Sequence, residues 1–239
     1  MEWRPVPGLV SIVIPAYNEA KTLEAIVARV EKVPIAKEIL VAEDGSTDGT
    51  KEIAARLGRE GRVVPLLAER NGGKGMAFRR GLAAARGEVT IIQDADLEYD
   101  PEEIPRVVAP ILEGRLDVCY GSRIRGAAER GETRRSSFAF YWGGRVVSLT
   151  TTLLYFTYVT DEPTCYKAFR TALVREIPLE GTGFEVEPEI TAKVLRSGLR
   201  YGEVPISYHP RSHAEGKKIR WTDGLKALST LAAWRVRPF

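Results

Sequence analysis

Short apolar runs alternate with helical patterns through the first half of the chain, and this alternation constrains the fold more than any other feature. An unbroken apolar run of about four to eight residues is typical of a strand buried on both faces. The strand patterns cover residues 10–15, 38–42, 63–67 and 89–93, and the helical patterns cover 21–33, 50–57 and 75–85. This alternation predicts an α/β fold with a doubly wound, mostly parallel sheet flanked by helices.

The second half of the chain is less regular. Helical patterns cover residues 104–112, 136–155, 187–195 and 222–234, and strand patterns cover 117–120 and 201–208. The segment 124–133 is polar and rich in Gly and Arg, which predicts a loop, and 222–234 has basic flanks that favour an amphipathic helix. No internal repeat or linker separates these parts, so we expect one domain, residues 1–239, ending in C-terminal amphipathic helices.

The charges are segregated, although the net formal charge is only +3. The net charge is −4 over residues 1–114, +4 over 115–145, −2 over 146–208 and +5 over 209–239. The two basic blocks suit phosphates, an anionic membrane surface or nucleic acid, or they are simply solvated faces. The standard nucleic-acid-binding motifs are absent from the sequence, so nucleic acid is not an expected partner. The two cysteines cannot build a disulfide framework, which favours a reducing compartment.

Membrane and targeting signals are weak. Residues 1–8 are polar and rich in proline, so we expect no signal peptide. A run of about 20 apolar residues, which a membrane span needs, does not occur. The nearest approach, residues 136–160, has Arg145 as its only charge and is diluted by Ser, Thr and Gly. We interpret it as an amphipathic or core-packed helix that is able to touch a bilayer.

Acidic residues follow the fourth predicted strand directly. Asp94 and Asp96 come straight after residues 89–93, and Glu98 lies two positions further on. Ligands of parallel sheets bind beyond the carboxyl ends of the strands, and clustered carboxylates can share a divalent cation such as Mg²⁺ or Mn²⁺. The alternative is a solvated loop whose aspartates cap the helical turn that begins at Pro101.

Two further segments follow predicted strands at the same edge. Asp44 comes straight after the second strand, where its carboxylate could accept N–H groups of a nucleobase; Ser46 or Asp48 could instead simply cap the next helix. Asn71-Gly72-Gly73-Lys74-Gly75 is a glycine-rich turn that opens a helix, where backbone N–H groups and Lys74 could hold an anion. This turn fits neither the G-x-G-x-x-G nor the P-loop spacing, which disfavours a dehydrogenase or an NTPase.

Taken in order, these motifs resemble those of family 2 glycosyltransferases, in the branch of dolichyl-phosphate mannose synthase and its bacterial polyprenyl-phosphate counterparts. The matching segments lie within about residues 9–220 and are Val13-Ile14-Pro15-Ala16-Tyr17-Asn18-Glu19, Glu43-Asp44-Gly45-Ser46-Thr47-Asp48-Gly49-Thr50, Asn71-Gly72-Gly73-Lys74-Gly75, Gln93-Asp94-Ala95-Asp96-Leu97 and Gly121-Ser122-Arg123. The resemblance implies a GT-A fold, a nucleotide-sugar donor, Mg²⁺ or Mn²⁺, and inversion at the anomeric carbon.

The resemblance also implies roles on the donor side. The nucleoside pocket would be lined by Pro15, Ala16, Tyr17 and Glu19, with Asp44 on the base and Lys74 near the nucleotide. Asp94 and Asp96 would contact the ribose and the metal–diphosphate, with Glu98 as a further metal ligand, and Arg211, His213 and Lys217 belong to a segment that resembles a closing loop. The chain departs from the family pattern at Glu43, where Asp is common, and at Glu98, where the synthases often have Gln.

Arginines and glutamates mark the acceptor side. The resemblance implies that Arg123, Arg134 and Arg135 hold the acceptor phosphate, which arginine forks suit. Glu187 and Glu189 fall where the family has an acceptor-side acidic residue. Either would act as general base toward a hydroxyl, whereas an ionised phosphate needs none; both could also simply complement a helix dipole.

We therefore predict an inverting, metal-dependent transfer of a hexose from a nucleotide-sugar of the GDP-mannose or UDP-glucose type to a polyprenyl phosphate. Residues 9–122 would form the nucleotide-sugar half, 123–220 the acceptor half and 221–239 a membrane-interfacial helix. We expect a cytoplasmic protein, peripheral at the inner face of the cell membrane. The alternatives are transfer to a hydroxyl of a saccharide or small molecule, and a non-catalytic nucleotide-sugar binding module.

Overall fold

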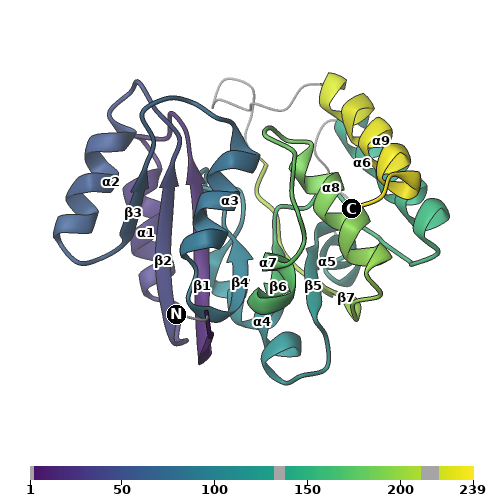
Figure 1. The fold of residues 1–239 in the computed structure, drawn as a ribbon, viewed down its shortest axis with the longest axis horizontal. Helices are drawn as coiled ribbons and strands as arrows, with labels where there is room; N and C mark the ends of the chain where they lie inside the picture. The colour runs from purple at the N-terminus through teal and green to yellow at the C-terminus, as the bar shows by residue number, and fades with distance from the viewer. Residues whose placement is uncertain (1–2, 132–137, 211–220) are drawn as a thin grey trace.

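A mixed sheet forms the centre of the molecule (Figure 1). The computed structural model describes residues 3–131, 138–210 and 221–239. Within them the strand order is β3-β2-β1-β4-β6-β5-β7, and β6 alone runs antiparallel to both of its neighbours. The strands are β1 Val6–Ala16, β2 Lys37–Glu43, β3 Val64–Leu67, β4 Gly87–Ile92, β5 Val118–Ser122, β6 Lys167–Arg170 and β7 Tyr201–Pro205. The predicted doubly wound, mostly parallel sheet is confirmed.

Helices cover both faces of the sheet, which explains why the central strands are mostly apolar. On β1, Ile12 and Ile14 pack toward α1, α2 and α4, while Val13 packs on the opposite side toward α3 and α8. The described helices are α1 Leu23–Glu31, α2 Thr50–Arg59, α3 Lys74–Ala84, α4 Ile104–Leu112, α5 Arg123–Glu129, α6 Phe138–Tyr155, α7 Thr171–Arg175, α8 Val186–Arg196 and α9 Trp221–Val236. Alternate side chains of one strand thus enter two separate cores.

A third, smaller core joins the C-terminal helix to the rest of the molecule. It contains Val147 and Tyr155 of α6, Ala192 of α8, and Leu231 and Trp234 of α9. The hydroxyl of Tyr155 donates to the carbonyl of Leu231 at 2.6 Å. None of the described helices has both the length and the apolar character that crossing a membrane requires.

One prediction for the second half was wrong, and two elements there were not predicted. The expected loop 124–133 begins as helix α5, because the Ser122 side chain accepts the Arg125 N–H at 3.1 Å and caps the helix. Gly126 leaves room there, since a Cβ at that position would lie 1.9 Å from the carbonyl oxygen of Ile206. Strand β6 and helix α7 were not predicted, because the short sequence of β6 carries a lysine and an arginine and has no apolar pattern.

Asp117, the residue directly before β5, allows a test of how the stability of the protein depends on pH. Asp117 accepts hydrogen bonds from Arg200 Nε at 2.9 Å and Nη2 at 2.7 Å, and these bonds lower its pKa from 3.8 to about 2. A lowered folded-state pKa means that the stabilisation is complete above the unfolded value and is lost as pH falls through the folded value. Because the Arg200 side chain is 53% exposed, we expect Asp117→Asn to cost only about 1 kcal/mol at neutral pH.

The measurement is thermal unfolding of the wild type and Asp117→Asn between pH 7 and pH 2. The difference in Tm is expected to shrink as pH falls from about 4 to about 2, because Asp117 of the wild type then becomes protonated. Glu113→Gln is the control, because Glu113 and Arg115 form a pair in which both side chains are more than half exposed. A Tm difference that stayed constant over this range would contradict the assignment.

Candidate active site

The predicted donor-side residues of the first 98 positions lie at or after the carboxyl ends of β1, β2, β3 and β4, and the first two of these strands are adjacent to each other. The loops after β1 and β2 are joined directly, since Asn18 N–H donates to Ser46 Oγ at 3.0 Å and Glu19 N–H donates to Thr50 Oγ1 at 2.8 Å. Asn18 has a φ of 52°, a left-handed conformation that asparagine tolerates better than most residues. The residues assigned to the nucleoside pocket, Pro15, Ala16, Tyr17 and Glu19, therefore lie along one side of this junction.

Asp44 is buried and organises the glycine-rich turn. Its Oδ2 accepts the N–H groups of Gly72 at 3.1 Å and Gly73 at 2.7 Å, and its Oδ1 lies 2.9 Å from Arg80 Nη2. The carboxylate thus already has three donors within the protein. Base recognition by Asp44 stays a prediction, and the structure adds a supporting role that the sequence did not indicate.

The turn 71–75 needs its glycines because it packs against the backbone of residues 181–182. Gly73 has a φ of 90°, and a Cβ at Gly75 would lie 2.2 Å from the carbonyl oxygen of Gly181. The N–H of Gly75 donates to the carbonyl of Thr182 at 2.7 Å. The N–H groups of Gly72, Gly73 and Gly75 therefore bind protein acceptors, and anion binding by this turn stays a prediction.

Lys74 stands at the centre of a buried charge cluster. Its Nζ lies 3.0 Å from Asp94 Oδ1, 3.0 Å from Glu187 Oε1 and 3.2 Å from Cys165 Sγ. Burial alone would lower the pKa of Lys74, but attraction to Asp94, Cys165 and Glu187 raises it well above 10.5. Lys74 is therefore charged at neutral pH. The roles of Lys74 and Asp94 toward a donor stay predictions, and the structure adds the contact between the two side chains and the contact with Cys165.

A second lysine fixes Glu187 from the other side. Lys167 is fully buried, and its Nζ lies 2.8 Å from Glu187 Oε2, while it also donates to the carbonyls of Glu162 at 2.9 Å and Thr164 at 2.6 Å. Burial raises the pKa of Glu187, but Lys167 and Lys74 outweigh it and the net shift is downward. A carboxylate held ionised between two ammonium groups is a poor proton acceptor at neutral pH.

Glu189 has a different position from Glu187. The Glu189 side chain is buried, at 1% exposed. Its Oε1 accepts the Glu180 N–H at 2.8 Å and lies 2.6 Å from Lys193 Nζ. Its Oε2 accepts the Gly181 N–H at 2.6 Å. Both oxygens are occupied within the fold. Glu189 thus holds the loop that packs against Gly75, and its role as a general base stays a prediction.

The three predicted metal ligands do not form a ready-made group. Over residues 3–131, 138–210 and 221–239, no three His, Cys, Asp or Glu side chains are placed to hold a cation. Asp94 pairs with Lys74, Asp96 Oδ1 accepts the Glu98 N–H at 3.1 Å, and Glu98 Oε2 accepts the hydroxyl of Tyr208 at 2.6 Å. Glu98 therefore has Tyr208 as a partner, and cation binding by Asp94, Asp96 and Glu98 stays a prediction.

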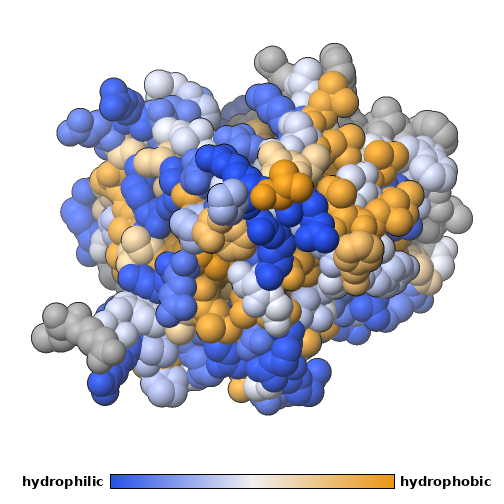
Figure 2. All heavy atoms as spheres, turned by 45° about the vertical axis from the view of Figure 1, so that its right-hand side comes forward, coloured by the Kyte–Doolittle hydropathy of each residue, from blue (hydrophilic) through white to orange (hydrophobic). Residues whose placement is uncertain are grey.

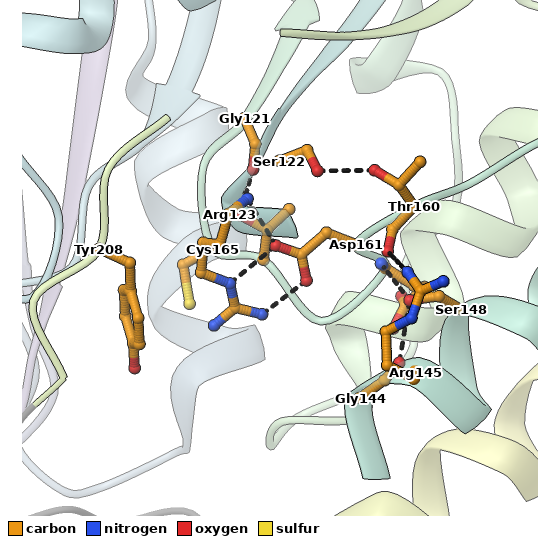
Figure 3. Close-up of polar contacts among 12 residues, drawn as sticks. Gly121, Ser122, Arg123, Gly144, Arg145, Ser148, Thr160, Asp161, Cys165 and Tyr208 are labelled. Atoms are coloured by element: carbon orange, nitrogen blue, oxygen red, sulfur yellow. Dashed lines mark hydrogen bonds and ion pairs between the residues drawn. The ribbon is translucent and has the colours of Figure 1, made fainter. Parts of the chain in front are cut away.

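Arg123, the predicted acceptor-phosphate residue, is paired inside the protein. Its Nε and Nη2 donate to Asp161 Oδ2 and Oδ1 at 2.8 and 2.7 Å, and its backbone N–H reaches Oδ2 at 2.9 Å (Figure 3). Its guanidinium carbon lies 4.9 Å from the centre of the Tyr208 ring. The sequence segment 161–167 had no assigned role, yet it supplies Asp161, Cys165 and Lys167. The other predicted cations, Arg134, Arg135, Arg211 and Lys217, together with His213, lie outside the described residues.

Comparison with known proteins decides the family. Residues 11–178 match the profile of glycosyl transferase family 2. The chain belongs to this family. It is 30% identical to dodecaprenyl-phosphate galacturonate synthase of Rhizobium johnstonii, over 89% of this chain and 63% of the relative. It is also 30% identical to dolichol-phosphate mannosyltransferase of Pyrococcus furiosus, over 87% of this chain and 58% of the relative. The chain thus spans less than two thirds of either relative, and both support the polyprenyl-phosphate branch of the family.

Solved structures agree on the fold. Glucosyl-3-phosphoglycerate synthase from Mycobacterium tuberculosis, in complex with Mn²⁺, UDP and glucosyl-3-phosphoglycerate, superposes with a TM-score of 0.70 at 24% identity, over 97% of this chain and 81% of that one. Mannosyl-3-phosphoglycerate synthase from Rubrobacter xylanophilus gives 0.72 at 22% identity, over 95% and 74%. The expected GT-A fold of this glycosyltransferase is therefore confirmed.

Proposed function

We propose that the protein transfers a hexose, with inversion, from a nucleotide-sugar to a polyprenyl phosphate. The observation that carries this proposal is Glu187 fixed between Lys74 and Lys167 at 3.0 and 2.8 Å, together with Glu189 committed to backbone N–H groups. Neither glutamate suits the general base that a hydroxyl acceptor requires. A phosphate acceptor is already ionised at neutral pH, so it needs no base. The names of both relatives also contain a polyprenyl phosphate.

On the donor side, Lys74 supplies a permanent positive charge beside Asp94. We propose that it faces the departing diphosphate and stabilises the charge that develops there. Asp94 and Asp96 fit a divalent cation, because Mg²⁺ and Mn²⁺ take oxygen ligands and often use one or two carboxylates plus phosphate oxygens. Such a cation, when bound, neutralises the leaving diphosphate. A protein of the same fold was solved with Mn²⁺ and UDP, which supports this assignment.

On the acceptor side, Arg123 is held in one orientation by Asp161. We propose that a phosphate oxygen of the acceptor attacks the anomeric carbon in line with the bond to the diphosphate. That oxygen forms the new C–O bond, the old bond breaks, and the nucleoside diphosphate leaves with the electron pair. The protein's part is to position the two phosphates and balance their charge.

An exposed apolar stripe on α6 supports membrane contact. Trp142, Val146, Leu149 and Leu153 follow helical spacing on α6, and Phe156 lies just beyond its end; these side chains are between 50% and 84% exposed. Figure 2 turns this side of the molecule forward and shows hydrophobic side chains gathered there. Such a stripe on a surface helix suits the interface of a bilayer. We propose that it holds the protein at the membrane that carries the lipid acceptor.

Replacing Leu149 and Leu153 together by aspartate is expected to weaken binding to anionic phospholipid vesicles by about 10-fold or more, since each buried leucine contributes roughly 1.5–3 kcal/mol. Co-sedimentation with vesicles of phosphatidylglycerol and phosphatidylethanolamine measures the change. Leu67→Asp is the control, because Leu67 is 42% exposed and its strand, β3, lies on the opposite side of the molecule from α6 (Figure 1). Equal binding by the double variant and the control would sink the membrane assignment.

The function itself is tested by nucleotide release from a panel of GDP- and UDP-hexoses, with and without Mg²⁺ or Mn²⁺ and a short-chain polyprenyl phosphate. We expect release that depends on both the cation and the lipid phosphate, and a glycosylated lipid product. No stimulation by the lipid phosphate with any donor would overturn the acceptor assignment. Undiminished metal-dependent release by Asp96→Ala would overturn the donor-site assignment.

A further inference from the structure

Arg145 is an arginine on α6 without an acidic partner. Its Nη1 donates to the carbonyl of Thr160 at 2.9 Å, and this is its one hydrogen bond to the part of the chain that the structure describes. The side chain is half-buried, beneath the loop that leads to Asp161. An arginine that is partly removed from water and lacks a carboxylate is suited to bind an anion.

The acidic side chains around Arg145 bind other donors. Asp161 is 3% exposed and is fully engaged by Arg123, which donates to both of its carboxylate oxygens. The Arg123–Asp161 pair is therefore close to neutral. Figure 3 shows Arg123 and Arg145 on opposite sides of Asp161. The Glu203 carboxylate accepts the N–H and the hydroxyl of Thr160 at 2.9 and 2.5 Å, and it forms no ion pair with Arg145 among the described residues.

Arg145 also borders the apolar stripe of α6. It precedes Val146 by one position and Leu149 by four, so on the helix surface it lies along the edge of the stripe. An amphiphile that laid its hydrocarbon chain against the stripe would bring its head group to this edge. Arginine binds phosphate oxygens through a planar fork of N–H groups, and the N–H groups other than the one on Thr160 have no acceptor among the described residues.

We propose that Arg145 binds the phosphate monoester of the acceptor, while Arg123, fixed by Asp161, forms the adjacent wall of the same subsite. This inference rests on the proposed function and adds a residue to it. The sequence indicated only Arg123, Arg134 and Arg135 for this phosphate. Arg145 contributes affinity for the acceptor and has no contact with the donor side.

The experiment compares Arg145→Gln and Arg145→Lys with the wild type, using a short-chain polyprenyl phosphate in detergent micelles. Arg145→Gln is expected to raise KM for the lipid phosphate by about 10-fold or more, because a hydrogen bond to a charged group is lost. Arg145→Lys should fall between, since it keeps the charge without the fork. The Kd for UDP or GDP, measured by calorimetry, and the Tm are expected to stay close to the wild type.

Arg125→Gln is the matched control. Arg125 lies on α5 in the same basic block and, like Arg145, donates to one backbone carbonyl, that of Glu203 at 2.6 Å. Its KM for the lipid phosphate should not change. Inorganic phosphate is the second probe: we expect it to compete with the lipid in the wild type and about 10-fold less well in Arg145→Gln.

The outcomes separate this inference from the proposed function. A wild type that is not stimulated by the lipid phosphate overturns the proposed function. A stimulated wild type with an unchanged KM in Arg145→Gln overturns the role of Arg145. Lower Tm and weaker nucleotide binding in both Arg145 variants would give Arg145 a purely structural role and also overturn it. Weaker vesicle binding by Arg145→Gln with an unchanged KM in micelles would also overturn the proposed role, since Arg145 would then bind bilayer head groups.

Discussion

Replacement of Lys167 by methionine is expected to lower the free energy of unfolding by about 3–5 kcal/mol, the usual cost of removing one partner from a buried ion pair. Lys167 is fully buried, lies 2.8 Å from Glu187 Oε2 and donates to two carbonyls in the segment 162–164. Methionine fills a similar volume but leaves these acceptors without their donor. Urea unfolding followed by circular dichroism measures the loss.

A double-mutant cycle identifies the cause of that loss. If repulsion of an uncompensated Glu187 dominates, then Lys167→Met combined with Glu187→Gln should cost less than the sum of the two single changes. Lys51→Met is the control, because Lys51 is partly buried and donates to the carbonyl of Ala68 at 3.1 Å without an acidic partner. A loss below about 1 kcal/mol for Lys167→Met would show that the buried pair is replaceable.

The helices and strands that were predicted are those whose sequence pattern is visible within a few neighbouring residues. Strands β1, β2 and β4 are mostly apolar because both of their faces are covered, and helix α4 has the bounds that its apolar spacing predicts. Strand β6 escaped prediction because Lys167 takes the place of an apolar core residue. That lysine is compatible with burial only through Glu187, twenty residues away in the sequence. Such compensation has no signature in a local window.

The candidate site also contains residues that could be predicted and contacts that could not. Asp44, Lys74 and Asp94 were predicted because each follows or begins an element at one edge of a parallel sheet, and topology alone brings them together. The partners of these residues were not predictable. Asp161 pairs with Arg123 across 38 residues, and Cys165 meets Lys74 across 91. The two lysines on the Glu187 carboxylate are the reason that we propose an acceptor that needs no general base.

Replacement of Lys74 by methionine is expected to cut kcat for nucleotide release by about 100-fold or more, comparable to the loss of one preorganised donor at a developing negative charge. The reason is electrostatic. Lys74 is the cation that contacts Asp94, and attraction to the surrounding anions keeps it protonated. Steady-state kinetics with a saturating donor, cation and lipid phosphate measures the change. An effect on transition-state charge appears in kcat, whereas uniform binding of the donor would appear in KM alone.

Lys74→Met also leaves Asp94 and Glu187 with one counter-charge fewer, so two further variants are needed to separate this effect from the loss of charge at the diphosphate. Lys74→Arg retains the charge, and it should recover part of the rate if charge is what matters; Lys51→Met, on α2, should leave kcat unchanged. The Tm of each variant separates lost stability from lost catalysis. If Lys74→Met retained its fold and most of its kcat, the cation at the diphosphate would have to come from elsewhere, and Lys74 would serve only to hold Asp94 and Glu187 together. Partial recovery by arginine with an unchanged donor KM is the pattern that only the electrostatic role produces.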